Sequence, residues 1–280
     1  MGKSNSKHLR RGLSLDQMPA TVLYDEKSFV DFVTDVFAQE VELNDSMQTL
    51  FRGNCAASRL MSHCFRTFGS KYLKQLLEPH IPTPAIETAT PASTTTGATT
   101  TTTITSTAAN NDTAATTTTD IATNISYEID STKLEEDGDI DLNQKNLLKL
   151  TKQILDSILS SANDFPPQLN LMCICLRNVL CKKYPNSDTY LKAVGTVIFL
   201  RFINPAIVAP YESGIVDKQP PPKITRGLML VSKILQNIAN NVEFSKEEHM
   251  LPFNDFVRTQ FEPMRKWVIQ ISSERTQINI

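Results

Sequence analysis

The feature of this 280-residue sequence that most constrains its fold is the segment from Leu191 to Ile203, which is apolar on almost every side. A helix that is apolar all round is buried on every side, so other elements must surround it. Asn204-Pro205 follows directly and predicts the end of this helix, because the residue before a proline disfavours the α conformation. We therefore expect a fold built around one central helix.

The rest of the chain has the period of amphipathic helices from about residue 24 to 80 and again from about 142 onwards. One face of a helix after Pro166-Pro167 is formed by Leu169, Met172, Cys173, Leu176, Val179 and Leu180. Another helix is predicted from about 225 to 240. There is no series of alternating strands and no Gly-rich phosphate loop, so the predicted fold class is all-α.

Residues 82–126 are dominated by Thr, with Ala, Pro and Asn, and cannot bury enough apolar surface to offset the entropy of ordering. We expect a disordered insertion within a helical domain of residues 23–275, preceded by a basic flexible tail, residues 1–22. The glycosylation sequons at Asn111 and Asn124 leave a mucin-like segment open. A surface insertion between two helices is favoured, because the N-terminus shows no secretory signal.

Composition limits the classes of partner and site. A net charge of −2 gives no global basic field, so nucleic acid is not an expected partner. The five cysteines are odd in number and contain no C-x-x-C pair, which predicts reduced thiols, no metal and a cytoplasmic protein. No apolar run reaches the roughly 18 to 20 residues that a membrane span needs.

Two arginines, Arg201 and Arg52, occupy positions where a charged side chain needs an explanation. Arg201 lies within the most apolar stretch, where a guanidinium needs either an internal ion pair or hydrogen bonds to loop carbonyls. Arg52 lies in a predicted loop, where Gly53 and Asn54 tolerate turn conformations and Phe51 can anchor the loop to the core. This leaves Arg52 to project, although an ordinary solvated arginine fits the same pattern.

These residues also carry a family resemblance. Phe199-Leu-Arg-Phe-Ile-Asn-Pro-Ala206 resembles the signature helix of the Ras GTPase-activating (RasGAP) domain family, and Thr49-Leu-Phe-Arg-Gly-Asn54 resembles its arginine-finger loop. The resemblance is closest to neurofibromin and its fungal relatives. It covers roughly residues 23 to 270 apart from the Thr-rich segment, with further motifs in the same order, so the expected fold is the helical RasGAP type.

The resemblance implies a GTPase activator that stimulates GTP hydrolysis by a Ras-type small GTPase in its GTP form and negatively regulates Ras signalling. Arg52 would be the finger supplied in trans, Arg201 would hydrogen-bond the finger loop, and Phe51, Gly53 and Asn54 would support that loop. The implied GTPase-binding residues are Leu200, Asn204, Lys233, Gln236, Asn240 and Lys246. No cofactor of its own and no independent hydrolase activity are expected, since the partner carries GTP and Mg²⁺.

Two alternatives to activation are a non-catalytic scaffold that binds the GTPase and a structural helical-repeat protein. The presence of both arginines favours activation over a scaffold. The absence of an internal period of roughly 30 to 50 residues argues against a repeat protein.

The N-terminus adds an expectation about membranes. Gly2 fits the N-myristoylation pattern, and Lys3, Lys7, Arg10 and Arg11 supply a basic cluster. A lipid chain with a basic cluster would recruit the protein to the inner face of a membrane. A chance glycine on a flexible tail explains the same residues.

Overall fold

The structure is a computed structural model that describes residues 25–44, 49–82, 125–185 and 189–274. The expected basic tail with Gly2, and residues 83–124 of the Thr-rich insertion expected at 82–126, lie outside the described residues.

Every regular element of the described residues is helical, which confirms the all-α class. The longer helices are α2 (Glu26–Leu43), α3 (Ala56–Leu77), α5 (Ile140–Ser160), α6 (Pro167–Lys183), α7 (Thr189–Ile198), α9 (Pro222–Asn240) and α11 (Phe261–Ile271). The shorter ones are η2 (Glu78–His80), η3 (Ser131–Lys133), η4 (Ala162–Asp164), η5 (Phe199–Ile203), α8 (Asn204–Val208), η6 (Glu248–Phe253) and α10 (Asn254–Thr259).

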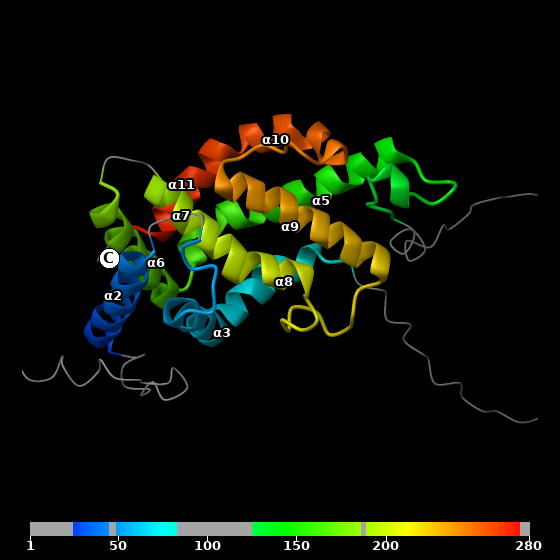
Figure 1. Cartoon of the computed structure of the whole chain (residues 1–280). Helices are drawn as coiled ribbons and strands as arrows, with labels where there is room; N and C mark the ends of the chain where they lie inside the picture. The colour runs from blue at the N-terminus through cyan, green and yellow to red at the C-terminus, as the bar shows by residue number, and fades with distance from the viewer. Residues whose placement is uncertain (1–24, 45–48, 83–124, 186–188, 275–280) are drawn as a thin grey trace, which may run out of the picture.

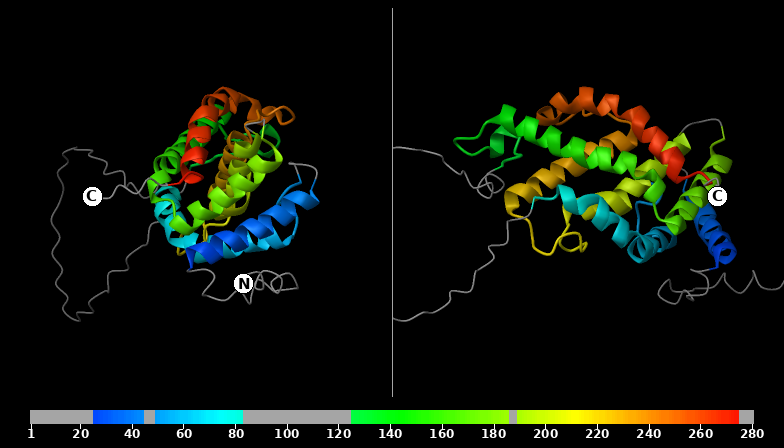
Figure 2. Two further views of the ribbon diagram at one scale, coloured as in Figure 1. Left: turned by 90° about the vertical axis from the view of Figure 1, so that its left-hand side faces the viewer. Right: turned by 180° about the vertical axis from the view of Figure 1, so that it is seen from behind.

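The helices pack around the segment formed by α7, η5 and α8. It contacts α6, α9 and α11 through α7, α3 through η5, and α9 again through α8. Helices α2 and α6 pack together at one end, while α5 and α9 run side by side (Figure 1). Figure 2 shows α3 on one side of α5 and the α10–α11 segment on the opposite side. The predicted central helix is therefore present, but the expectation that it is buried on every side is wrong. Lys192 and Leu200 are exposed, and Thr196 and Arg201 are half-buried.

The central helix does not end at Asn204-Pro205, so that prediction is wrong. It widens into a π-helical turn, η5, in which the Asn204 N–H donates to the Phe199 carbonyl, and then continues as α8 to Val208. Pro205 is tolerated because it occupies the first turn of α8, where a missing N–H costs little. Isolated π turns inside α-helices are frequent at functional sites.

The expectation that no apolar segment is long enough to span a membrane is wrong for the same helix. Residues Thr189–Val208 are long and apolar enough, by length and composition alone, to cross a membrane. However, 61% of its apolar 18-residue window is buried inside the fold, as in the core helix of a globular domain.

Aromatic rings fix the register of the central helix against its neighbours. The Phe202 ring, from η5, stacks on Phe65 with centroids 4.7 Å apart and on Tyr72 at 6.1 Å. Phe165 meets Phe202 edge-on at 6.3 Å and Trp267 at 6.0 Å. Because Phe202 follows Arg201 directly, this packing also fixes the direction in which the Arg201 side chain projects from the helix.

Gly69 on α3 makes room for Phe202, and we expect its replacement by alanine to destabilise the protein. A Cβ at this position would lie 2.3 Å from Phe202 Cε2, so the ring or the helix must shift. The expected cost is about 1–3 kcal/mol, larger than the gain of about 1 kcal/mol in helix propensity. Thermal unfolding measures the difference, with the exposed neighbour Ser70→Ala as the control; equal midpoints for Gly69→Ala and wild type would contradict this packing.

Candidate functional site

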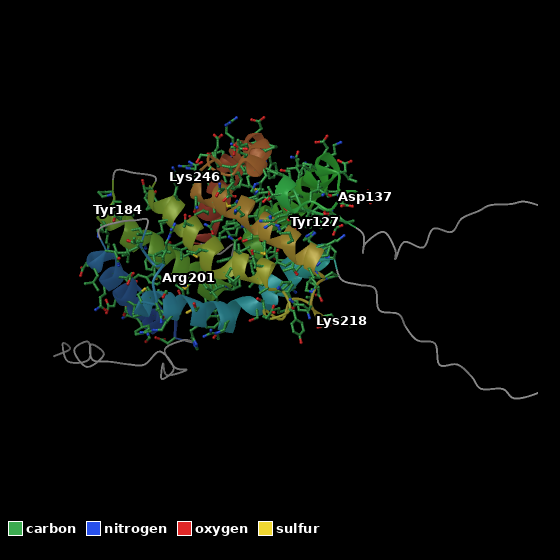
Figure 3. All side chains as sticks on the ribbon, turned by 45° about the vertical axis from the view of Figure 1, so that its right-hand side comes forward. Tyr127, Asp137, Tyr184, Arg201, Lys218 and Lys246 are labelled. Atoms are coloured by element: carbon green, nitrogen blue, oxygen red, sulfur yellow. The ribbon has the colours of Figure 1, made fainter. Side chains whose placement is uncertain are left out.

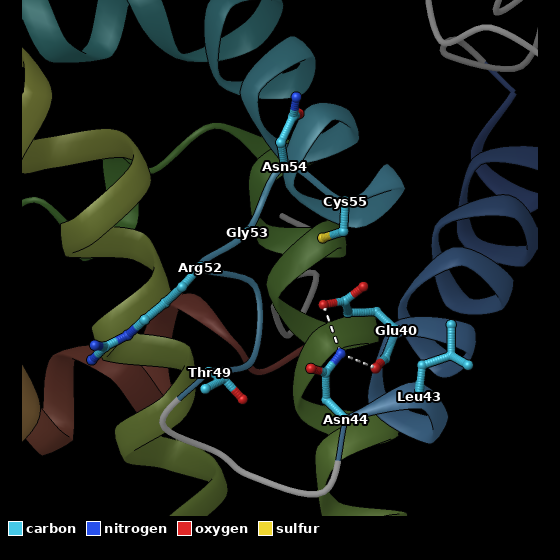
Figure 4. Close-up of a pocket in the computed structure, with 8 residues that line it drawn as sticks. All are labelled: Glu40, Leu43, Asn44, Thr49, Arg52, Gly53, Asn54 and Cys55. Atoms are coloured by element: carbon cyan, nitrogen blue, oxygen red, sulfur yellow. Dashed lines mark hydrogen bonds between the residues drawn. The ribbon is translucent and has the colours of Figure 1, made fainter.

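The loop that carries Arg52 joins α2 to α3, and its entry is fixed by Lys183 of α6. The Lys183 ammonium donates hydrogen bonds to the Val41 carbonyl and, at 2.6 Å, to the Asn44 carbonyl. Carbonyls at a helix C-terminus lack partners within the helix and attract cations, so Lys183 caps α2. The Asn44 side chain donates in turn to the Glu40 carbonyl and carboxylate (Figure 4).

At the other end of the loop, α3 begins with Cys55 as its N-cap, whose Sγ accepts from the Ser58 N–H at 3.3 Å. The Ser58 hydroxyl is buried and donates to the Gly53 carbonyl at 2.8 Å. Neither Ser58 nor Lys183 was among the predicted site residues, because neither contact has a signal in the sequence beyond the polar residue itself. Gly53 is thus held through its carbonyl, while the Asn54 side chain is exposed at the edge of the loop (Figure 4).

The left-handed conformation in this loop falls on Phe51, with φ of 59°, and not on Gly53 or Asn54, whose types favour it. An aromatic residue seldom adopts positive φ, and the strain is of order 1–3 kcal/mol. The ring is fully buried and packs edge-on against Phe37 of α2 with centroids 5.6 Å apart. Burial of the ring therefore offsets the backbone strain and fixes the direction in which the next residue, Arg52, leaves the loop.

Arg201 binds the main chain of the loop. Its Nε and Nη2 donate to the Phe51 carbonyl at 3.1 and 2.7 Å, and Nη2 also donates to the carbonyls of Arg52 and, at 3.1 Å, Gly53. Of the two arrangements that the sequence left open, the structure shows hydrogen bonds to loop carbonyls. One planar guanidinium therefore spans three consecutive carbonyls of a loop about 150 residues away in sequence.

The Arg52 side chain itself is exposed, and the described part of the chain offers its guanidinium no hydrogen bond or ion pair. Figure 4 shows it extending away from Glu40 and Asn44. The residue lines a groove of about 430 Å³ together with Thr196, Leu200, Arg201, Gln236 and Asn240. The guanidinium is therefore available to a molecule that docks on this groove.

Polar side chains form a connected chain along the floor of the groove. The Thr196 hydroxyl donates to Asn240 Oδ1 at 2.8 Å, and Gln236 Nε2 donates to the same oxygen at 2.9 Å. Asn204 Nδ2 donates to Gln236 Oε1 at 2.9 Å. Asn204 is 7% exposed, so it reaches the surface only through Gln236, whereas Leu200 presents its side chain directly.

The cations of α9 are occupied by ion pairs. Lys233 lies 2.5 Å from the Glu247 carboxylate, and Arg226 binds Glu128 through two hydrogen bonds of 2.8 and 3.0 Å. Burial raises the pKa of Glu128, but the hydrogen bonds and charge of Arg226, together with backbone N–H groups, bring it below its usual value. Met229, 48% exposed, lies one turn from each cation. The face of α9 is therefore less cationic than its sequence indicates.

The structure thus brings together most of the predicted site. The groove collects Arg52, Arg201, Leu200, Gln236 and Asn240, with Asn204 beneath them. Lys233 and Lys246 do not line it: Lys246 is exposed and follows the C-terminal end of α9 (Figure 3). Thr196 was missed, although it is the single hydroxyl in the apolar stretch from Val194 to Leu200.

A second hollow, of about 680 Å³, adjoins the same loop and is lined by Arg52, Gly53, Asn54 and Cys55 together with Glu40, Leu43, Asn44 and Thr49 (Figure 4). The described residues contain no group of three or more His, Cys, Asp or Glu side chains that could hold a metal ion. All five cysteines are free thiols, and burial raises the pKa of Cys64 to about 12, which makes it unreactive.

Comparisons with known proteins agree with the geometry. Residues 32–240 match the family described as GTPase-activator protein for Ras-like GTPase. The chain is 31% identical over 254 residues to the probable Ras GTPase-activating-like protein ngap of Dictyostelium discoideum, covering 90% of this chain and 24% of that protein. It is 30% identical over 223 residues to human Ras GTPase-activating protein 1, covering 79% of this chain and 18% of that protein. The chain thus spans less than a quarter of each of these relatives, and the closer likeness to neurofibromin stays a prediction.

Proposed function

The chain belongs to the family of GTPase-activator proteins for Ras-like GTPases, and from this premise we propose that it binds a Ras-type small GTPase in its GTP form and supplies Arg52 to the GTPase active site. The observation that supports this proposal most directly is that one loop combines a free arginine side chain with a firmly bound main chain. The Arg52 side chain is exposed and unpaired among the described residues, while its carbonyl and those of both neighbours are held by Arg201.

The proposed chemistry needs little from this chain beyond a positioned charge. Hydrolysis of GTP builds negative charge on the oxygens of the transferring phosphoryl group, and catalysis consists mainly of positioning and electrostatic stabilisation. A guanidinium that enters a site from which water is excluded stabilises that charge more strongly than it would in water. Arg201 fixes the loop before the partner arrives, so less ordering is required when the complex forms.

The groove beside the loop would receive the GTPase surface. Leu200 offers apolar contact, and the amides of Gln236 and Asn240 offer hydrogen bonds. Lys246 and Lys233 would act at the rim of the interface, where charges chiefly set the rate of association and its dependence on salt. GTP and Mg²⁺ would be carried by the partner.

One experiment tests the proposal against its nearest alternative. The rate of GTP hydrolysis by a panel of Ras-family GTPases would be measured under single-turnover conditions with and without this chain, and binding to the GTP and GDP forms would be measured in parallel. Acceleration with preferential binding of the GTP form is the expected result. Binding without acceleration would make the protein a non-catalytic scaffold instead.

The ion pair of Lys233 leads to a prediction about association. Glu247→Gln should free the Lys233 ammonium for acidic groups of the GTPase and raise the association rate by about two- to fivefold at low salt. The gain should shrink above about 0.15 M salt, because exposed pairs are screened there. Stopped-flow association at two salt concentrations measures this.

Glu243→Gln provides the matched control for that prediction, because Glu243 also belongs to an exposed pair, with Arg258, and its loss changes the net charge equally. An equal gain from both variants would assign the effect to net charge and not to Lys233.

A further inference from the structure

The hydrogen bonds along the polar chain beside Arg52 all run in one direction, from Asn204 through Gln236 to Asn240. Among the described residues they leave a group without a partner at each end: the buried Asn204 Oδ1 at one end and the Asn240 NH₂ at the other. Asn240 Oδ1 accepts two hydrogen bonds, from the Thr196 hydroxyl and from Gln236 Nε2, so both lone pairs of this oxygen are engaged. The amide NH₂ of Asn240 carries two donors, and no described residue accepts from it. Asn240 is half-buried and lines the same groove as Arg52.

An unused NH₂ in a docking groove needs an acceptor once the groove is covered. A donor that becomes buried without a partner costs the complex the full desolvation penalty of that group, whereas a well-placed acceptor recovers it. The acceptor chemistry that fits is an oxygen, either a carboxylate or a main-chain carbonyl of the partner. The orientation of the Asn240 carboxamide then matters. If the carboxamide were rotated by 180°, its oxygen would face the acceptor oxygen of the partner and no hydrogen bond could form.

Resting on the proposed function, we infer that Thr196 is a positioning residue for GTPase recognition, which holds the Asn240 carboxamide so that its NH₂ meets an oxygen acceptor of the bound GTPase. Thr196 comes from α7 and Asn240 from the last turn of α9, so their hydrogen bond joins two separate helices at the groove. Gln236 lies on the same helix as Asn240, one turn earlier, and restrains the amide only from that side. The Thr196 hydroxyl supplies the second, cross-helix restraint.

Thr196 is suited to this role by its surroundings. It lines the groove with Arg52 and Leu200, but its hydroxyl takes no part in the hydrogen bonds from Arg201 and Ser58 that hold the carbonyls of the finger loop. Loss of its hydroxyl should therefore disturb recognition of the GTPase without disturbing the position of Arg52. The KM for the GTP-bound GTPase should change, and the kcat of activated hydrolysis should not.

The test uses the isosteric Thr196→Val variant, with Thr196→Ser as the control that keeps the hydroxyl. We expect Thr196→Val to raise KM on the order of fivefold, the equivalent of one net hydrogen bond, and to leave kcat within about twofold of wild type. Thr196→Ser should restore KM to the wild-type value. Thermal unfolding of both variants shows whether they are folded.

A double-mutant cycle tests whether Thr196 acts through Asn240. Thr196→Val should have no further effect on KM in an Asn240→Ala background, because the group that it positions is gone. The inference is overturned if Thr196→Val leaves KM unchanged, if Thr196→Ser raises KM equally, or if the effect persists without Asn240. Failure of the wild-type chain to accelerate any GTPase would instead overturn the proposed function on which the inference rests.

Discussion

Arg52→Ala should lower the single-turnover rate of GTP hydrolysis in the complex by about 10³- to 10⁵-fold while leaving binding to the GTP form of the GTPase nearly unchanged. This range is the one established for arginine fingers supplied in trans to Ras-type GTPases; it does not come from the geometry of this chain. The structural reason for unchanged binding is that Arg201 holds the loop through its carbonyls, which alanine retains.

Two further variants sharpen this prediction. Arg52→Lys should recover little of the rate, because an ammonium lacks the planar set of donors of a guanidinium. Arg59→Ala, which removes an exposed arginine of α3 outside the groove, should behave as wild type. If Arg52→Ala lost binding and rate in equal measure, Arg52 would be a docking residue and the proposed chemistry would be wrong.

Arg201→Ala should produce the second-largest loss, on the order of 10²-fold in the activated rate, although Arg52 remains present. Removing the guanidinium leaves the carbonyls of Phe51 and Arg52 without this donor and leaves the Gly53 carbonyl with Ser58 alone. A displacement of about 1 Å in a catalytic group is enough for such a loss of rate. The free energy of unfolding should also fall by about 1–3 kcal/mol. Single-turnover kinetics and denaturant unfolding measure the two effects separately.

Combining Arg52→Ala with Arg201→Ala distinguishes two roles of Arg201: positioning of Arg52 and stabilisation of the fold. If Arg201 acts through Arg52, the Arg52→Ala/Arg201→Ala double variant should be no slower than Arg52→Ala alone. A lower stability of Arg201→Ala with an undiminished rate would assign Arg201 to structure only. Arg201→Lys should fall between wild type and Arg201→Ala, because one ammonium cannot span three carbonyls equally well.

The sequence predicted the parts of the fold that depend on local pattern. Helical periodicity identified the all-α class, and the apolar stretch identified the central helix, because a largely buried helix leaves a pattern in the sequence itself. The same pattern did not show that one side of this helix, with Leu200, would line an open groove. The cost of burying a guanidinium likewise required a partner for Arg201, and loop carbonyls were one of the two candidates. The structure supplies them.

The sequence could not predict features that arise from packing between distant segments. The π turn at Phe199–Ile203 replaces a predicted helix end, and the positive φ of Phe51 is stabilised by a ring on another helix. The contacts of Ser58, Lys183 and Thr196 depend on which helices meet. The ion pair of Lys233 with Glu247 likewise shows that a cation predicted for a partner can already be used within the chain.

The way in which Arg201 holds the loop makes residue 52 interchangeable. Arg201 binds only backbone carbonyl oxygens of the loop, which every amino acid has. The conformation of the loop therefore does not depend on which side chain residue 52 carries. A fluorescent label attached to the cysteine of Arg52→Cys would then lie on a loop of unchanged conformation. Its fluorescence would measure binding of the GTPase. If the proposed function holds, Arg52→Ala would bind the GTP form of the partner without accelerating its hydrolysis, and could be used to isolate that complex.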